Sequence, residues 1–390
     1  MGRSILKFLL PVLLVVAAFL TAKYLDANPR QVVTDAPPVQ AHSRPVDFEV
    51  QESMYQETTM ATEPTELKIP EETGAEPEET EPAETEPQRR YVLTLGGDCT
   101  LGGNPGQVIA DQGFVTIVGE DYQYPFRNIR PWLAGDDFTM VNLECVLTDT
   151  GHPVVRDHPF QGKEAYTDIL SGSSVEVVSL ANNHTMDYGE TGYKTTCTVL
   201  DNAGISYVER DKSRIITLES GLSIGIYTSV YYKMDAKVIQ KEIAALREAG
   251  ADVVIFAAHW GYEGNYKPRK EEKNIARAAV DAGADIVYGT HPHVLQPVET
   301  YKNGVIFYSL GSLCYGGSVQ VKDMDTALVQ VELIVGEDGA VSVDKWTAVP
   351  CSISSEENLN NYQPTPYADD SDGYRRVMSK LDGSWQMTHN

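Results

Sequence analysis

The chain has 390 residues, with 31 Lys and Arg against 56 Asp and Glu, and its formal net charge is −25. This length is enough for one large domain or two ordinary ones, and the acidic balance argues against nucleic acid as a partner. The five cysteines form no C-x-x-C pair, so a zinc site built on cysteine is not expected. We expect Cys99 and Cys145 to be small, packed residues, and we assign no disulfide.

The first 25 residues have the pattern of a targeting segment. Arg3 and Lys7 are followed by a run without charge over residues 8–22, which is long enough for a spanning helix when Lys7 snorkels. Basic residues before the run and acidic residues after it place the amino end inside the cell. We therefore expect residues 1–25 to be an uncleaved anchor of a single-pass cell-membrane protein with an extracellular C-terminal domain. A cleaved signal peptide, which would give a secreted protein, is the alternative.

Residues 26–88 are predicted to be an acidic, disordered linker. They are rich in Pro, Glu and Thr, with three copies of Thr-Glu-Pro, and residues 47–87 hold fourteen Asp and Glu against the single Lys68. Such a composition cannot bury a core, and its charges repel one another into an extended spacer. After a membrane anchor, a spacer of this kind would hold the following domain away from the bilayer.

The globular part is expected over residues 89–350, where apolar strand-like runs alternate with segments of helical periodicity. Strands are predicted at 91–97, 138–143, 177–181, 253–258, 285–289, 305–310, 327–335 and 340–349, and helices at 163–171, 190–202, 235–249 and 270–282. Alternation of this kind is typical of βαβ units and a largely parallel sheet.

The last two strands have no helix between them. Glu337-Asp338-Gly339 is a hairpin turn signal, so we expect a second, partly antiparallel sheet. Two sheets flanked by helices make a four-layer α/β/β/α sandwich, which is our predicted fold class. Residues 351–390 are expected to form a polar C-terminal tail with one helix near 372–381.

Polar side chains follow five of the predicted strands, where the carboxyl ends of parallel strands meet at one edge of a sheet. Neutral imidazole, carboxylate and amide oxygen are ligands of Mn, Zn and Fe, and two such ions can clamp a phosphoryl centre and supply hydroxide. The pattern therefore predicts one or two divalent metal ions. The candidate ligands are Asp98, Glu144, Asn183, His259, His291 and His293.

Three further residues are candidates for catalysis beside these ligands. His184 is not needed as a ligand, so it is suited to protonate a leaving group, and Asp187 could orient it. Glu263, near His259, is either catalytic or bonded to its own loop, and the sequence does not decide between these roles. Asn182 is favoured as a structural cap.

Six segments resemble, in order, the motifs of the CapA family of bacterial capsule, or poly-γ-glutamate, synthesis proteins. They are Gly97-Asp98, Asn142-Leu143-Glu144, Leu180-Ala181-Asn182-Asn183-His184-x-x-Asp187-x-Gly189, His259-Trp260-Gly261-x-Glu263, Gly289-x-His291-Pro292-His293-Val294-x-Gln296 and Tyr308-Ser309-Leu310-Gly311. The resemblance covers residues 91–315. The family is related to calcineurin-like metallophosphoesterases, whose four-layer sandwich carries a two-metal centre.

The resemblance implies a role for each candidate residue. Asp98 matches the first metal-binding Asp, Glu144 takes the place of the bridging carboxylate, and Asn183 matches the Asn ligand. His184 would be the general acid. His259 and His291 would serve one metal and His293 the other.

Three departures from the family pattern affect the site. The phosphoesterase motif Asp-x-His is here Asp98-Cys99-Thr100, so one metal shell lacks a His. Glu263 is separated from Tyr266 by two residues where the family has a close Glu-Tyr pair. The usual Ser-Leu-Gly-Asn-Phe becomes Ser-Leu-Gly-Ser-Leu at 309–313.

The resemblance implies a membrane-anchored, extracellular protein of capsule or poly-γ-glutamate biosynthesis. We expect a metal-dependent, phosphoesterase-like hydrolase that acts on a phosphoryl or polymer substrate, with His184 protonating the leaving group. Its expected partners are a cell-envelope or capsule polymer and membrane synthase subunits. Two other functions stay open: a non-catalytic polymer-binding or export subunit of a capsule synthesis complex, and a metal-dependent amide hydrolase of the polymer.

Overall fold

The structure is a computed structural model that describes residues 88–106, 111–154, 157–231 and 234–386. The predicted membrane anchor and all but the last residue of the predicted linker lie outside these ranges. None of the helices within them combines the length and the apolar composition that a membrane span requires.

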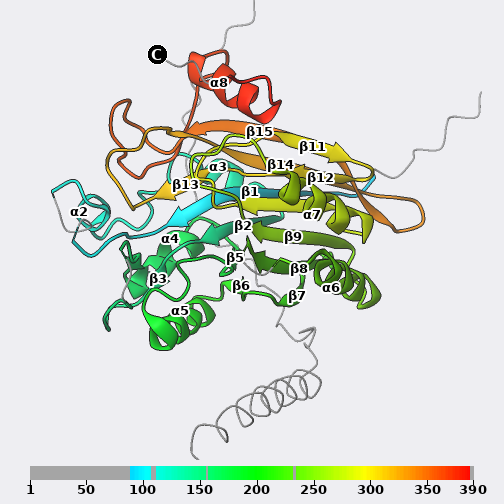
Figure 1. Ribbon diagram of the computed structural model, residues 1–390, viewed down its shortest axis with the longest axis horizontal. Coiled ribbons are helices and arrows are strands. Elements are labelled where there is room, and N and C mark those ends of the chain that lie inside the picture. Colours follow the sequence, from blue (N-terminus) through cyan, green and yellow to red (C-terminus); the bar gives the residue numbers. More distant parts are fainter. Residues whose placement is uncertain (1–87, 107–110, 155–156, 232–233, 387–390) are drawn as a thin grey trace, which may run out of the picture. The chain divides into compact units, whose positions relative to one another are not determined.

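The first sheet has eight strands in the described part of the chain (Figure 1). Its parallel half contains β1 (Arg90–Thr100), β2 (Phe138–Leu143), β5 (Val177–Ser179) and β6 (Ser206–Val208). On the other side of β1, β14 (Asp325–Val335), β15 (Val341–Ser352) and β16 (Thr365–Pro366) pair antiparallel. The short strand β13 (Ser312–Tyr315) runs parallel to the carboxyl end of β1. The predicted hairpin turn lies between β14 and β15, with Gly339 at φ 82°.

The second sheet has six strands among the residues described, and its centre is parallel. The order is β11 (Val298–Tyr301), β12 (Gly304–Phe307), β10 (Ile286–Thr290), β9 (Val253–His259), β8 (Ser223–Val230) and β7 (Ser213–Thr217). The edge strands β11 and β7 pair antiparallel with their neighbours. A separate ribbon joins β3 (Val146–Leu147) to β4 (Gln161–Gly162).

The longer helices begin or end at residues that are typical of helix caps. In α6 (Ala236–Glu248), the Asp235 side chain accepts a hydrogen bond from the Lys237 backbone N–H, and Gly250 follows the helix at φ 91°. Both α7 (Lys270–Asp281) and α5 (Gly189–Asn202) are also followed within two residues by a glycine at positive φ. The other helices before residue 300 in the described part of the chain are α2 (Phe114–Val118), α3 (Arg130–Leu133) and α4 (Thr167–Ser171), the last preceded by the 3-10 turn η1 (Glu164–Tyr166).

In the described part of the chain, the four layers are separated by three large apolar cores. One core lies between the sheets and contains Leu93 and Ile255. A second lies between the first sheet and α2–α5 and contains Phe114 and Leu200. A third packs α6 and α7 on the second sheet and contains Ile243. The predicted four-layer α/β/β/α architecture is confirmed.

The C-terminal segment departs from the prediction. Strand β15 continues to Ser352, and α8 (Asp372–Leu381) buries Val377 and Leu381 against the first sheet. Arg376 and Lys380 on the same helix form ion pairs with Asp325. Residues 351–386 therefore complete the domain rather than form a polar tail, because a polar helix needs only one apolar stripe to pack.

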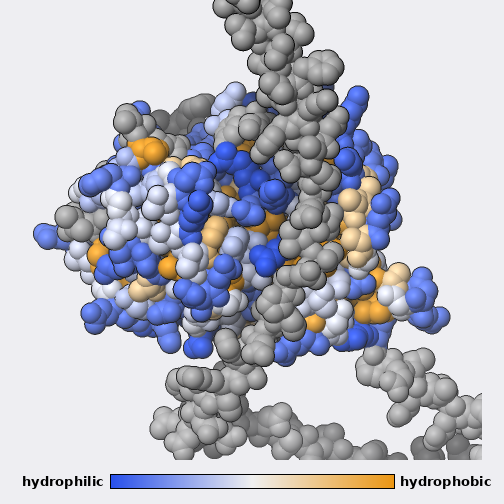
Figure 2. Space-filling view, turned by 90° about the horizontal axis from the view of Figure 1, so that it is seen from below, coloured by the Kyte–Doolittle hydropathy of each residue, from blue (hydrophilic) through white to orange (hydrophobic). Residues whose placement is uncertain are grey.

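The surface of the described residues is largely polar. Large hydrophobic side chains are exposed there at Ile117, Val154, Tyr231 and Tyr262. Figure 2 shows one face, on which hydrophilic residues predominate and hydrophobic ones form small, scattered patches.

Candidate metal centre

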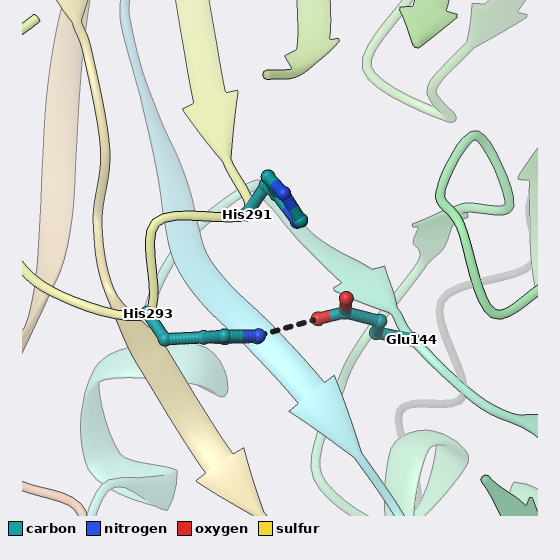
Figure 3. A group of neighbouring side chains, drawn as sticks. All are labelled: Glu144, His291 and His293. Carbon is teal, nitrogen blue, oxygen red and sulfur yellow. Dashed lines mark ion pairs between the residues drawn. The ribbon is translucent and has the colours of Figure 1, made fainter. Parts of the chain in front are cut away.

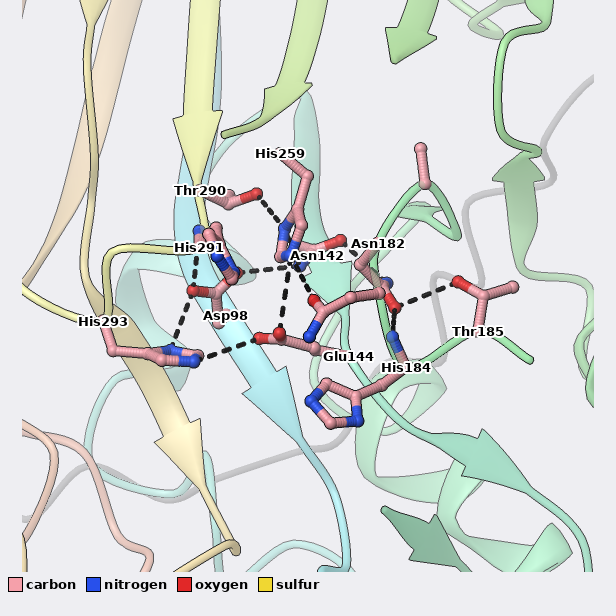
Figure 4. A network of polar contacts seen from close by, with 12 residues as sticks. Asp98, Asn142, Glu144, Asn182, His184, Thr185, His259, Thr290, His291 and His293 are labelled. Carbon is pink, nitrogen blue, oxygen red and sulfur yellow. Dashed lines mark hydrogen bonds and ion pairs between the residues drawn. The ribbon is translucent and has the colours of Figure 1, made fainter. Parts of the chain in front are cut away.

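The carboxyl ends of strands from both sheets meet at one place, and the predicted ligands lie there (Figure 4). Asp98 lies in β1, Glu144 directly follows β2, and Asn183 lies in the turn after β5. From the second sheet, His259 is the last residue of β9 and His291 directly follows β10. All six candidate ligands are brought together, although they span almost 200 residues of sequence.

Close backbone approach holds Asp98 in place. The Asp98 backbone N–H donates to the Gly311 carbonyl oxygen at 2.9 Å. A Cβ at Gly97 would lie only 2.1 Å from that same oxygen. The glycine before Asp98 is therefore required for β1 to reach the segment that leads into β13.

Glu144 lies at the centre of the cluster. Its Oε1 is 3.5 Å from His259 Nε2 and its Oε2 is 3.9 Å from His293 Nε2. The side chain is fully buried, and neither oxygen accepts a hydrogen bond from the residues that the structure describes. Burial, with a smaller contribution from Asp98, raises the pKa of Glu144 well above its ordinary value. A buried carboxylate in this state is stabilised by a cation.

Asp98 and His293 form a second contact at the centre. The Asp98 Oδ2 atom is 3.1 Å from His293 Nδ1, and it also accepts from the His291 backbone N–H at 3.1 Å. Burial lowers the pKa of His293, but Glu144 and Asp98 outweigh it and raise that pKa to about 9. Without a metal, the His293 imidazolium therefore supplies positive charge between the two carboxylates.

The other two imidazoles are neutral. Burial, then His291, holds the pKa of His259 well below its ordinary value, and burial, then His293, lowers that of His291 to about 4. His259 Nε2 lies 2.6 Å from Asn183 Oδ1, and its Nδ1 lies 2.9 Å from Thr290 Oγ1. Neutral imidazole is the form that binds divalent metals.

The donor set fits a divalent cation. Glu144, His291 and His293 offer ligand atoms that all lie within 4.8 Å of one another (Figure 3). Both Glu144 oxygens and His291 Nδ1 are buried without a hydrogen-bond partner among the described residues, which is rare unless a water or ion completes the site. The hydroxyl of Thr100, which replaces the expected His, is also buried without such a partner.

Backbone strain coincides with the two histidines that follow β10. His291 has φ 98° and His293 has φ 55°, both in the left-handed region that non-glycine residues rarely adopt. Such residues cost on the order of 1–3 kcal/mol each and cluster at functional sites. The segment that carries these imidazoles is therefore held in shape by its surroundings before any ligand binds.

His184 and Asp187 form the predicted pair beside the cluster. His184 Nδ1 is 2.7 Å from Asp187 Oδ2, and the imidazole stacks on Phe160 with ring centroids 4.1 Å apart. The same Asp187 oxygen accepts from the Phe160 backbone N–H at 2.7 Å. Asp187 thus fixes both the imidazole and the ring beneath it, and Nε2 is the ring atom left for proton exchange.

Asn182 has the structural role that its sequence position favours. Its Nδ2 donates to the Leu143 carbonyl oxygen at 2.8 Å and its Oδ1 accepts from the His184 backbone N–H at 3.0 Å. Glu263 lies on an exposed loop after β9. This loop lies near the cluster, because the Gly264 backbone N–H donates to the carbonyl oxygen of Pro292, which stands between His291 and His293, at 2.8 Å.

Comparison with known proteins identifies the family. Residues 92–316 match the family described as "Bacterial capsule synthesis protein PGA_cap". The chain belongs to this family. It is 30% identical over 293 residues to "Capsule biosynthesis protein CapA" of Bacillus anthracis, covering 68% of each chain. It is also 30% identical over 287 residues to "PGA biosynthesis protein CapA" of Bacillus subtilis (strain 168), covering 67% of this chain and 73% of the relative.

A more distant relative and one solved structure are also similar. The chain is 26% identical over 285 residues to a "Probable polyglutamine synthesis accessory protein" of Mycobacterium tuberculosis, covering 57% of this chain and 73% of the relative. The crystal structure of TT1561 of Thermus thermophilus aligns with 62% of this chain and 94% of its own, at 12% identity and a TM-score of 0.38.

The PGA_cap match begins in β1 and ends just after β13, so it includes every candidate site residue. It stops before β14, β15 and β16, which complete the first sheet in this PGA_cap protein. The predicted membership in the CapA family is confirmed.

Sequence reasoning did not single out several residues that contact the cluster. Asn142 Nδ2 donates to Asp98 Oδ1 at 2.7 Å, and Ser312 Oγ is 3.1 Å from His293 Nδ1. The Tyr315 ring lies 5.4 Å from the His293 ring, measured between centroids. Asn142 stands in a quoted motif and could have been found, whereas Tyr315 follows an apolar run and carries no signal.

Proposed function

We propose that this protein is a metal-dependent, phosphoesterase-like hydrolase that works in the assembly of an anionic capsule polymer such as poly-γ-glutamate. The observation that carries the proposal is the fully buried Glu144 carboxylate, which has no hydrogen-bond partner among the described residues and lies between three imidazoles. The names of the Bacillus relatives, which refer to capsule and PGA biosynthesis, support the choice of polymer.

Two groups of residues would hold the divalent ions. Glu144 would be shared, with Asp98 and His293 on one side and Asn183, His259 and His291 on the other. When bound, such ions polarise phosphoryl oxygens and lower the pKa of bound water towards neutrality. Mn, Zn and Fe all suit this mixture of nitrogen and oxygen donors.

The chain's own residues supply orientation and proton transfer. Asp187 accepts from His184 Nδ1, which keeps the Nε2 atom available to protonate the leaving oxygen. Asn182 fixes the His184 backbone, and Phe160 stacks beneath the ring. Glu263, on its exposed loop, is proposed to act at the entrance, where its carboxylate would orient water or substrate.

The location and partners belong to the same proposal. Residues 1–25 would anchor the protein in the cell membrane as a single pass, or be cleaved to release it, and residues 26–88 would extend outward from the bilayer. The partners would then be the cell-envelope or capsule polymer and membrane synthase subunits. The uncharged run and the acidic spacer support this location.

Metal analysis together with turnover tests the proposal. The full chain is purified, its Mn, Zn and Fe content is measured, and hydrolysis of bis-p-nitrophenyl phosphate is followed with added Mn²⁺. We expect His293→Ala to lose bound metal and His184→Ala to keep metal but lose turnover. His152→Ala, at an exposed position, is the matched control and should do neither. Absence of bound metal, with His293→Ala indistinguishable from wild type, would refute the proposal.

A non-catalytic subunit that holds or guides polymer is the second candidate. The observation in its favour is Thr100, whose buried hydroxyl stands where the phosphoesterase motif Asp-x-His would supply a second imidazole beside Asp98 and His293. Metal binding without turnover of any phosphodiester, combined with binding of poly-γ-glutamate, would support it. New chain ends in a poly-γ-glutamate assay would instead indicate an amide hydrolase.

A further inference from the structure

Tyr315 lies between the two functional parts of the site. On one side its ring centroid is 5.4 Å from that of His293, at the candidate metal cluster. On the other side it meets Phe160 edge-on at 6.1 Å, and Phe160 in turn stacks on His184. Tyr315 therefore contacts both the metal cluster and the ring that supports the proposed acid. The reacting group of a substrate held between these two parts would lie beside it.

The Tyr315 hydroxyl is available to a ligand. It makes no hydrogen bond to any residue that the structure describes, although the side chain is partly buried. The ring that carries it lies beside the His293 imidazole at the cluster, with centroids 5.4 Å apart. A Cβ at Gly317 would lie 2.6 Å from the hydroxyl oxygen, so a larger residue at this position would collide with the hydroxyl.

Strand pairing explains how this tyrosine reaches the site. Strand β13 runs parallel to the end of β1, and Tyr315 is the register partner of Thr100. Thr100 is the position at which related phosphoesterases carry a metal-binding His. The residue beside that position thus carries a neutral hydroxyl, which can donate to an anion without adding charge.

We propose that Tyr315 contacts the substrate directly and that its hydroxyl donates a hydrogen bond to a non-bridging oxygen of an anionic phosphoryl group held at the candidate metal centre. This inference rests on the proposed function. It adds a substrate-binding residue on the side of the site where Asp98 and His293 lie and where Thr100 stands in place of a second His. Hydrogen bonds to a charged partner are stronger than neutral ones, so loss of this one has a measurable effect on affinity.

Tyr315→Phe tests the inference, because it removes only the hydroxyl and keeps both ring contacts. Binding of inorganic phosphate to the Mn²⁺-loaded full chain is measured by calorimetry, together with Mn²⁺ affinity and thermal stability. We expect phosphate affinity to fall about 10–100-fold, with Mn²⁺ affinity and Tm unchanged. Tyr308→Phe, which removes a hydroxyl bonded to Glu299, is the matched control and should leave phosphate binding unchanged.

The other outcomes separate this inference from the proposed function. Equal phosphate affinity in wild type and Tyr315→Phe overturns the inference and leaves the proposed function standing. Loss of Mn²⁺ affinity or of the folded state in Tyr315→Phe also overturns it, because the hydroxyl would then have a structural role. If the Mn²⁺-loaded wild-type protein binds no phosphate, the inference fails. The proposed function is then tested separately by the phosphodiester hydrolysis assay.

Discussion

Replacing Glu144 by Gln should have opposite effects on the protein with and without metal. The substitution keeps the size of the side chain and removes its charge. In the metal-free protein it relieves a buried carboxylate that accepts no hydrogen bond from the described residues. In the metal-loaded protein it removes the ligand that both ions would share.

The magnitudes follow from the burial of the group. A buried group without a hydrogen-bond partner costs about 1–3 kcal/mol when it is neutral, as the Gln amide would be, and more when it is charged, so exchanging carboxylate for amide should raise the unfolding free energy of the metal-free protein by about 1 kcal/mol. For a domain of about 300 residues that raises Tm by roughly 1.5–2 °C. Mn²⁺ at one hundred times its dissociation constant should stabilise wild type by about 2.7 kcal/mol and the variant by less than about 1 kcal/mol.

Thermal unfolding with EDTA and with Mn²⁺ measures both effects. Glu272 is the matched control, because it is also buried but accepts hydrogen bonds from the Arg269 backbone N–H and guanidinium. Glu272→Gln should lower Tm in EDTA and keep the full increase with Mn²⁺. The reasoning is refuted if Glu144→Gln melts below wild type in EDTA, or if its increase with Mn²⁺ matches that of wild type.

Three further predictions concern other parts of the molecule. Asp187→Asn should lower kcat for a phosphodiester by about 10–100-fold, because His184 loses its orienting partner. The metal content, measured by mass spectrometry, should stay at the wild-type level. An unchanged kcat would contradict this role. Burial raises the pKa of Glu176 to about 8. As the pH rises from about 4 to 8, the unfolded chain therefore releases this proton while the folded protein keeps it, and the free energy of unfolding falls. Glu176→Gln should therefore match wild type at pH 4 and exceed it by about 2–4 kcal/mol at pH 8 in urea unfolding, and a constant difference would contradict the assignment. Val377→Ala should destabilise the whole domain by about 1–3 kcal/mol in a single unfolding transition, and a wild-type midpoint would show that α8 is not part of the core.

Much of the fold was predictable because its central strands are continuous apolar runs. The range predicted for β2 is the observed one, and those for α5 and α7 differ from the observed bounds by one residue. Polar residues that directly follow such runs, such as Glu144 and His291, could be placed at one sheet edge from sequence alone. Parallel topology makes that edge common to all of them.

Other features depend on contacts that sequence periodicity does not reveal. Strand β8 lies in the second sheet and was not predicted, and it contains Gly225, where a Cβ would lie 2.8 Å from the Ala251 side chain. Tyr315 pairs with Thr100, which lies 215 residues away in the sequence, so the local sequence around either residue does not predict the pairing. The packing of α8 likewise depends on a stripe of few apolar residues in a polar segment.

The order of the strands has a consequence for how the chain assembles during synthesis. The second sheet is built from one continuous stretch, from β7 to β12, whereas the first sheet needs strands from both sides of that stretch. Arg90 in β1 pairs with Ile334 in β14, so the first sheet cannot close until the ribosome has passed that point. The strands of the second sheet are all available earlier, and His259, His291 and His293 are made before the partners that hold β1 in place. Asp98 therefore gains its β13 and β14 neighbours only after the three imidazoles have been made, so the cluster is among the last parts of the domain to be completed.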